Sequence, residues 1–117
     1  MSCLFDSLGA FVSIDSQTLR NKICDKLQEN QLLMDDLTCE QVVQLESEKP
    51  LDQYISSMRR PHVMGGATEI KIFCILFKKN VKVLSEPNKK TIEFVIDPTY
   101  PFVHLRWTGN HFDPVHR

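Results

Sequence analysis

A cysteine near the start of the chain and a histidine near its end are the residue types that thiol-based nucleophilic catalysis requires. Cys3 opens the segment CLFDSLGAF, and His111 lies in the segment NHFDPV. A nucleophilic cysteine needs a base that takes its proton, and the fold rather than the sequence spacing usually brings the two together. The pair therefore predicts a thiol hydrolase site assembled from both ends of one domain.

Asp113 extends this pair to three residues. Residues i and i+2 of an extended segment point to the same side, so His111 and Asp113 are expected to lie together while Phe112 faces the other way. A carboxylate there selects the imidazole tautomer and stabilises the imidazolium. Each residue also has an ordinary interpretation, because a cysteine beside a chain start is often a small buried apolar residue and a terminal histidine is usually solvated.

Up to residue 77, the sequence has the pattern of helices. Leu19, Ile23 and Leu27 recur every four residues, and Thr38 with Gln41 has the spacing of a capping box. The predicted helices are 3–12, 16–28, a short one between Thr38 and Pro50, one from Leu51 that Arg60-Pro61 terminates, and 67–77. The last of these is apolar nearly all round, so it is expected in the middle of the protein.

Beyond residue 80 the apolar period changes to two, which is typical of half-buried strands. The alternation predicts strands at 81–83, 92–96 and 103–107, with turns around Pro87 and Pro98. Helices that are followed by a mostly antiparallel sheet indicate an α+β domain rather than a doubly wound parallel sheet. In this arrangement a helical part carries Cys3 and packs on a small sheet that presents the histidine.

The composition is that of one ordinary globular domain. The 117 residues include 14 Lys and Arg against 15 Asp and Glu, and this net charge of -1 gives no reason to expect nucleic acid or anionic membrane as a partner. No apolar run reaches the ~20 residues of a membrane helix, and the first residues lack the pattern of a signal peptide. A reducing, cytoplasmic location is expected.

The four cysteines do not form a disulfide framework or a zinc motif. They are widely spaced and lack any CxxC or Cys/His cluster at ligand spacing. Cys24 and Cys74 fall on apolar helical stripes, which predicts burial. Cys39 follows a helix cap and is a second candidate for a reactive thiol, behind Cys3.

Four segments together resemble the ovarian tumour (OTU) family of cysteine proteases, which cleave ubiquitin and its relatives. They are CLFDSL at 3–8, LRNKICDKLQEN at 19–30, YISSMRRPHVMGGATEI at 54–70 and NHFDPV at 110–115. They are similar to the nucleophile box, the helix after it, the central Gly-Gly block and the terminal histidine box of that family. The resemblance implies a papain-like OTU fold formed by a single domain over residues 1–117.

The resemblance assigns catalytic roles to Cys3 as nucleophile, His111 as general base and Asp113 as the residue that orients the imidazole. A helix N-terminus at the cysteine would stabilise the thiolate through the helix dipole and free backbone N–H groups. The oxyanion donors would come from the backbone around Ser2 and Cys3. The chemistry needs neither a metal ion nor an organic cofactor.

The chain departs from the family pattern at two positions. The family usually carries Asp-Gly-Asn or a similar run ahead of the cysteine, whereas only Met1 and Ser2 precede Cys3 here. A few residues upstream of the nucleophile are therefore expected to be missing, and with them part of the oxyanion loop. Met64 stands where the family often has tryptophan, which is expected to alter packing rather than chemistry.

Five further residues are candidates for contact with substrate. Gly65 and Gly66 break the chain before the central helix, and they also suit the wall of a narrow channel that admits the Gly-Gly end of a ubiquitin-like tail. Trp107 and Phe112 are candidates for the core or for the lining of this channel. Asn110 suits a turn, and it could also support the histidine loop or donate near the active site.

The function implied by the resemblance is removal of ubiquitin or a ubiquitin-like modifier by cleavage after its C-terminal Gly-Gly, through a cysteine thioester. This makes the chain a deubiquitinase, a thiol protease of the ubiquitin conjugation pathway, acting as a monomer or as a module of a larger protein. Two alternatives stay open: a catalytically weak or inactive OTU-like module that binds ubiquitin, and a protease of a viral or mobile-element polyprotein. A plain structural domain would make the matching boxes a coincidence.

Overall fold

The computed structural model describes residues 3–30, 32–34 and 37–115. In these ranges the helices are α1 (Cys3–Val12), α2 (Ser16–Gln28), α3 (Cys39–Ser47), α4 (Leu51–Met58) and α5 (Ala67–Phe77). The strands are β1 (Leu32–Met34), β2 (Leu37–Thr38), β3 (Asn80–Ser85), β4 (Lys90–Phe94), β5 (Phe102–Trp107) and β6 (Phe112–Val115). The predicted α+β class is therefore confirmed.

The helix ends follow from local chemistry. Asp15 caps α2 by accepting a hydrogen bond from the Thr18 backbone N–H at 3.0 Å. Thr38 and Gln41 form the predicted capping box at the start of α3. Gly9 lies inside α1, where a Cβ would come within 2.3 Å of the Ile14 backbone oxygen. This position therefore requires glycine, because the chain turns back closely from α1 into α2.

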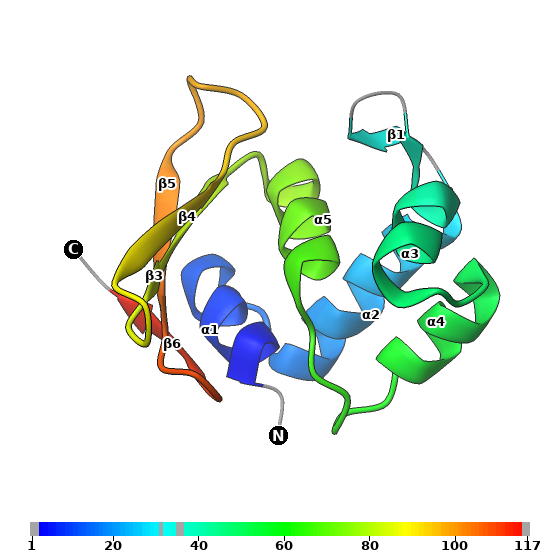
Figure 1. The fold of residues 1–117 in the computed structure, drawn as a ribbon, viewed down its shortest axis with the longest axis horizontal. Coiled ribbons are helices and arrows are strands. Elements are labelled where there is room, and N and C mark those ends of the chain that lie inside the picture. Colours follow the sequence, from blue (N-terminus) through cyan, green and yellow to red (C-terminus); the bar gives the residue numbers. More distant parts are fainter. Residues whose placement is uncertain (1–2, 31, 35–36, 116–117) are drawn as a thin grey trace.

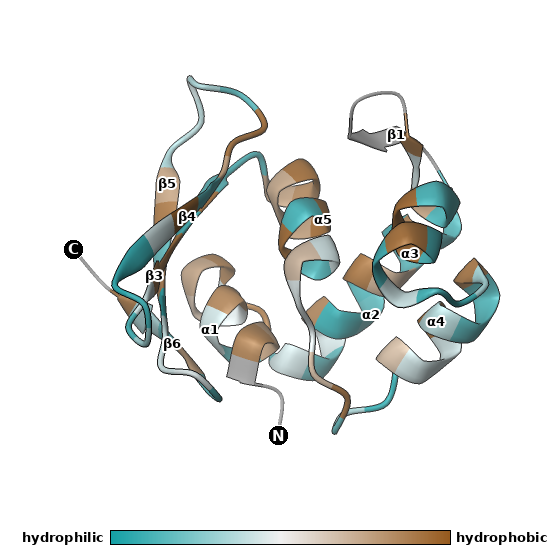
Figure 2. Ribbon diagram, viewed as in Figure 1, coloured by the Kyte–Doolittle hydropathy of each residue, from teal (hydrophilic) through white to brown (hydrophobic). Residues whose placement is uncertain are grey.

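The helix α5 forms the centre of the molecule, as its apolar sequence predicts. It contacts α2 on one side and the strands β3 and β4 on the other. Figure 1 shows α5 between the sheet and the group formed by α2, α3 and α4. Figure 2 shows apolar residues along α1 and much of α5, whereas the outer helices carry more polar residues. The core therefore extends on both sides of α5.

The main sheet has the strand order β4-β3-β5-β6 and is mixed. The pairs β3/β4 and β5/β6 are antiparallel, as expected, whereas β3 and β5 are parallel. The segment after β4 passes from one side of β3 to the other, and Ile96, predicted as strand, belongs to this segment. A second, two-stranded sheet of β1 and β2 was not predicted from the sequence.

A buried side chain holds the crossover segment in place. Asn80 is fully buried, and its amide nitrogen donates to the backbone oxygens of Asp97 at 2.9 Å and Tyr100 at 3.2 Å. Its amide oxygen accepts a hydrogen bond from the Ile96 backbone N–H at 2.9 Å. These bonds satisfy backbone groups of a segment that has no ladder partner of its own, and so they fix the parallel pairing of β3 with β5.

Candidate active site

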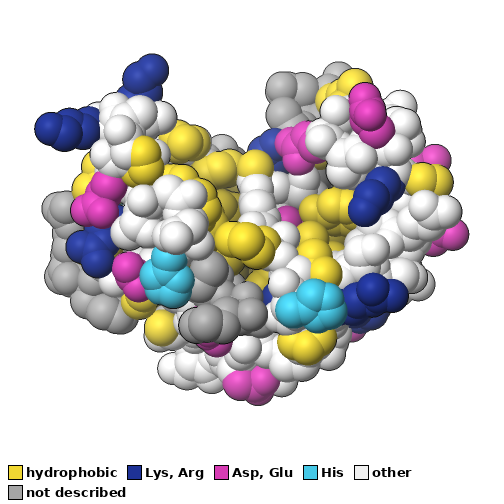
Figure 3. All heavy atoms as spheres, turned by 60° about the horizontal axis from the view of Figure 1, so that its bottom comes forward, with side chains coloured by type: hydrophobic (Ala, Val, Ile, Leu, Met, Phe, Trp, Pro, Cys, Tyr) yellow, Lys and Arg dark blue, Asp and Glu magenta, His cyan; other side chains and the backbone are white. Residues whose placement is uncertain are grey.

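Three segments that are far apart in the sequence lie at one end of the molecule. They are the start of α1, the turn between β5 and β6, and the connection between α4 and α5, all at the bottom of Figure 1. Figure 3 views the protein from this end and shows histidine side chains exposed on it. The fold thus brings the start of α1, the turn that leads into β6 and the Gly-Gly segment to one face.

His111 and Asp113 are in contact, as the i, i+2 spacing predicts. The imidazole Nε2 lies 3.0 Å from Asp113 Oδ1, and the two side chains are 43% and 33% exposed. With Nε2 next to the carboxylate, Nδ1 is the ring nitrogen that remains to exchange a proton with a thiol.

The turn before His111 is tight and internally bonded. The Thr108 backbone N–H donates to the His111 backbone oxygen at 3.0 Å, and Gly109 has a φ of 112°, which favours glycine. The Thr108 hydroxyl donates to Asn110 Oδ1 at 3.3 Å. Asn110 is exposed and lies in the bend between β5 and β6, and its role toward substrate stays a prediction.

The helix α1 begins at Cys3, so this residue lies where the backbone N–H groups of a helix have no intrahelical partners. One turn further along, Ser7 is on the same helical face by the i, i+4 period. Its buried hydroxyl donates to the Phe112 backbone oxygen at 3.0 Å, between His111 and Asp113. The structure describes Cys3 through its backbone, and Ser2, predicted as an oxyanion residue, lies outside the described residues.

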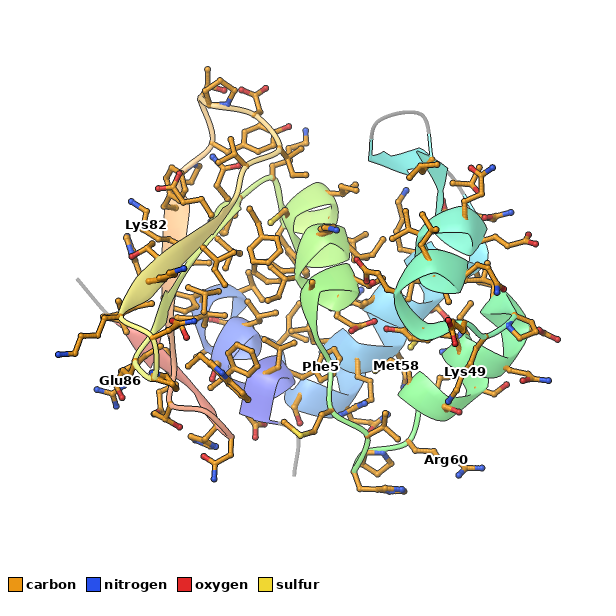
Figure 4. The ribbon with its side chains drawn as sticks, in the orientation of Figure 1. Phe5, Lys49, Met58, Arg60, Lys82 and Glu86 are labelled. Carbon is orange, nitrogen blue, oxygen red and sulfur yellow. The ribbon has the colours of Figure 1, made fainter. Side chains whose placement is uncertain are left out.

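Gly65 and Gly66 have different surroundings. A Cβ on Gly65 would lie 2.9 Å from side-chain atoms of both Leu4 and Phe5, so the backbone there packs directly on the first turn of α1. Figure 4 shows Phe5 in the interior, close to the connection that leads into α5. A Cβ on Gly66 would meet no atom within 4 Å. Close packing therefore accounts for the first glycine but not for the second.

The α4–α5 connection is held by a buried cation. Arg20 has 0% exposure and donates to the backbone oxygens of Met58 at 2.7 Å and Pro61 at 3.2 Å. Its guanidinium lies 4.2 Å from the ring centroid of Phe5, a cation–π contact. Through Arg20 the connection is fixed to α1 as well as to α2. Arg20 was not predicted as part of a site, since an arginine on a charged helix is usually solvated.

Glu69 at the start of α5 is the buried acid of this region. One carboxylate oxygen accepts a hydrogen bond from the Gly66 backbone N–H at 2.7 Å, and the other accepts one from the Tyr54 hydroxyl. Burial raises the pKa of Glu69, and the hydrogen bonds from Tyr54 and Gly66 oppose that rise. A structural role was predicted for Glu69 from the helix dipole. The hydrogen bond from Tyr54, 15 residues away in the sequence, adds a second structural contact.

Arg106 is a further residue of the site that the sequence analysis missed. Its guanidinium Nη2 donates to Asp113 Oδ2 at 3.2 Å, and its Nε lies 3.9 Å from Glu86 Oε2. Asp113 therefore uses one oxygen for Arg106 and the other for His111. Arg106 and Asp113 are direct partners in the pairing of β5 with β6, and this pairing could have been inferred only once the register of the two strands was known.

Trp107 and Phe112 are also direct partners across β5 and β6, with ring centroids 4.7 Å apart. Both are partly buried and pack on the core. With Ala67, Ile70 and residues of β3 and β4 they line an apolar cavity of ≈ 200 Å³ between α5 and the sheet. They therefore belong both to the edge of the core and to the wall of a cavity next to His111.

Cys24, Cys39 and Cys74 are all buried thiols. Burial raises the pKa of the Cys24 thiol to about 11 and that of Cys74 to about 12. Cys39, predicted as the second candidate for a reactive thiol, is only 2% exposed. Low access and a neutral thiol are the properties of structural cysteines.

Neither a metal-binding cluster nor a membrane-spanning helix is present in residues 3–30, 32–34 and 37–115. Within those ranges no cluster of His, Cys, Asp and Glu has the arrangement needed to hold a metal ion. Over the same part of the chain, no helix has both the length and the apolar character that crossing a bilayer requires.

Comparison with known proteins gives consistent results. A family model described as OTU-like cysteine protease matches residues 2–106, which is most of the chain and ends just before the histidine turn. The comparison with curated proteins found no match.

Several solved structures share the fold. An ovarian tumour domain in complex with ubiquitin superposes with a TM-score of 0.79 at 20% identity, over 97% of this chain and 62% of that one. The OTUD1 OTU domain gives 0.79 at 16% identity, covering 98% of this chain and 79% of that one. The viral OTU protease of Dera Ghazi Khan virus gives 0.72 at 16% identity, covering 96% and 72%. These identities establish the fold alone, and the chain spans 62% of the length of the first of these structures.

Proposed function

The chain belongs to the OTU-like cysteine protease family, and we propose that it removes ubiquitin or a ubiquitin-like modifier from proteins by nucleophilic attack of Cys3. The observation that carries this proposal is the contact of His111 with Asp113 on β6, a strand that the Ser7 hydrogen bond joins to the helix that begins at Cys3. A thiol, an imidazole and a carboxylate in this order form a catalytic triad.

In the proposed reaction, His111 Nδ1 takes the proton of the Cys3 thiol. The resulting thiolate is stabilised by its place at the N-terminus of α1. Asp113 accepts a hydrogen bond from Nε2–H, which keeps Nδ1 unprotonated before the transfer and stabilises the imidazolium after it.

The thiolate sulfur attacks the carbonyl carbon of the C-terminal glycine of the modifier. The C–N bond to the lysine amine breaks as His111 returns the proton to the leaving nitrogen, and a Cys3 thioester remains. Water, deprotonated by His111, then attacks the thioester carbonyl and releases the modifier as a free carboxylate and Cys3 as a thiol. Backbone N–H groups around Ser2 and Cys3 are the proposed donors to the oxyanion of each tetrahedral intermediate.

The modifier is proposed to be ubiquitin or a relative on two grounds. The first is the similarity to an OTU domain solved in complex with ubiquitin. The second is Gly66, which follows the glycine that packs on the first turn of α1 and whose own missing side chain leaves open space. A Gly-Gly tail lying along this backbone would need that space, and a residue with a side chain would not fit as closely. Phe112 and Trp107 are the proposed opposite wall.

The proposal is tested by hydrolysis of a fluorogenic ubiquitin C-terminal amide. The wild-type chain should release the fluorophore, Cys3→Ala should abolish release, and His111→Ala should lower kcat/KM by about 10²-fold or more. Cys39→Ser is the matched control for loss of a thiol and should retain activity. Specific ubiquitin binding with no turnover by any variant would contradict the proposal and support the non-catalytic binding module instead.

A further inference from the structure

The buried hydroxyl of Ser7 connects the first and last elements of the domain. Ser7 is 2% exposed, and its Oγ donates to the Phe112 backbone oxygen at 3.0 Å. The two residues are 105 positions apart in the sequence, and α1 packs against β6 around this bond. Such a bond fixes the relative position of two elements only if neither its donor nor its acceptor has another hydrogen-bond partner within reach.

The Phe112 oxygen has few alternatives because of its place in the sheet. The strand β6 is an edge strand, and hydrogen-bonded and non-hydrogen-bonded pairs alternate along the antiparallel ladder with β5. Since the Thr108 N–H donates to His111 O, the next pair, Trp107 with Phe112, is of the non-hydrogen-bonded kind. The Phe112 carbonyl therefore points away from β5, to the side on which Ser7 lies.

This bond lies between the residues of the proposed chemistry. Ser7 is one helical turn from Cys3 and on the same face, because side chains at i and i+4 lie above one another. Phe112 is the residue between His111 and Asp113. A shift of β6 along or away from α1 would change the distance between the thiol and the imidazole, and a displacement of about 1 Å can lower a catalytic rate about 10²-fold.

We propose that Ser7 is a positioning residue that sets the distance between Cys3 and His111 by holding the Phe112 carbonyl on the first helix. This inference rests on the proposed catalytic roles of Cys3 and His111. Ser7 touches neither substrate nor reacting atoms in this role. It acts through the backbone of β6, so its loss should alter thiol activation without altering recognition of the modifier.

The test compares Ser7→Ala with Ser7→Thr, which keeps the hydroxyl. Alanine favours a helix more than serine does, so Ser7→Ala is expected to fold. The readout is the rate at which a small neutral alkylating reagent modifies Cys3, located by peptide mapping, over pH 5 to 9. This rate follows the thiolate fraction and needs no modifier, so it stays informative if the protein does not cleave ubiquitin.

We expect Ser7→Ala to lower Cys3 alkylation at pH 7 about 5- to 20-fold and to move the pH midpoint of the reaction upward. Ser7→Thr should keep the wild-type midpoint. In a His111→Ala background, Ser7→Ala should have no further effect, because the imidazole through which it acts is gone. KM for a ubiquitin substrate should stay within about twofold while kcat falls.

The matched control is Ser47→Ala, which also removes a hydroxyl that donates to a backbone oxygen, that of Val43 at 2.8 Å within α3. Whatever the melting temperatures of the two alanine variants, only Ser7→Ala should change the alkylation profile. An unchanged profile in folded Ser7→Ala, or an equal additional loss in the His111→Ala background, would overturn the proposal and leave Ser7 a purely structural residue.

Discussion

At the residue scale, the carboxylate of Asp113 interacts with two partners. The activity of the proposed triad should therefore depend on the orientation of this carboxylate more than on its charge. Oδ1 faces His111 and Oδ2 faces Arg106. The arginine reduces the effective negative charge next to the imidazole, and it also restricts rotation of the carboxylate. An acceptor held in place should therefore serve His111 almost as well as a full negative charge does.

This view predicts different results for two substitutions of Asp113. Asp113→Ala should lower kcat/KM about 10²-fold, because the imidazole loses the acceptor that fixes it. Asp113→Asn should stay within about tenfold of wild type when Arg106→Gln is also present, because the amide oxygen can then accept from Nε2–H without its NH2 group facing a guanidinium donor, as in Cys-His-Asn triads. The measurement is the steady-state rate with a fluorogenic ubiquitin amide.

Arg106→Gln is the companion variant. Its ion pair with Asp113 is formed by side chains that are 45% and 33% exposed, and such pairs contribute about 0–1 kcal/mol. The rate should therefore change less than about fivefold. Equal losses in the Ala and Asn variants of Asp113 would show that charge matters more than orientation, against this account.

The buried acid Glu69 predicts a dependence of stability on pH. Its pKa is raised by burial, so the folded state holds its proton more tightly than the unfolded state does. The corresponding stability is fully present below the unfolded pKa of about 4.3 and is lost as the pH rises through the folded pKa. Glu69→Gln can accept from the Gly66 N–H and donate to Tyr54, and it carries no ionisable proton.

We therefore expect urea unfolding to give a free energy that falls as the pH rises above about 4.3 for wild type and falls less for Glu69→Gln. Glu93→Gln, which removes a carboxyl on the exposed strand β4, is the control and should keep the wild-type slope. A Glu69→Gln slope equal to that of wild type would mean that Glu69 ionises with the same pKa in both states.

At the scale of elements, the connection from α4 to α5 has two consecutive glycines with separate tasks. Gly65 lets the connection pack on Leu4 and Phe5 of α1, whereas a Cβ on Gly66, the next residue, would meet no atom within 4 Å. The first is a requirement of the fold, and the second is a requirement of the proposed substrate channel. Replacement of each glycine by alanine therefore gives a matched pair of variants.

Gly65→Ala should destabilise the fold by about 1–3 kcal/mol, because the new methyl group overpacks α1. Gly66→Ala should leave the free energy of unfolding within about 1 kcal/mol of wild type and should lower kcat/KM for a ubiquitin substrate about tenfold or more. Urea unfolding and steady-state kinetics measure the two effects. Full activity in Gly66→Ala would remove this residue from the channel wall.

At the scale of the whole molecule, periodic patterns in the sequence predicted the elements but not all of their neighbours. The five helices and the strands β3, β4 and β5 were located closely, because apolar residues repeat along each of them. The strands β1 and β2 are only three and two residues long, too short to display an alternation. The parallel pairing of β3 with β5 depends on Asn80 and the crossover segment, which carry no periodic signal.

The same distinction applies to the candidate site. The contact of His111 with Asp113 follows from local i, i+2 geometry, so the sequence was sufficient to predict it. Ser7 and Arg106 reach this pair through tertiary packing and strand register, and a single sequence shows neither. The catalytic roles of Cys3, His111 and Asp113 and the substrate contacts of the other candidates remain predictions.

The most direct test of the central claim is intact mass after incubation with a ubiquitin probe that carries a C-terminal electrophile. We expect one covalent adduct with the wild-type chain, none with Cys3→Ala and a strongly slowed reaction with His111→Ala. An adduct that persists in Cys3→Ala, or no adduct with folded wild-type protein, would contradict a ubiquitin-directed thiol site at Cys3.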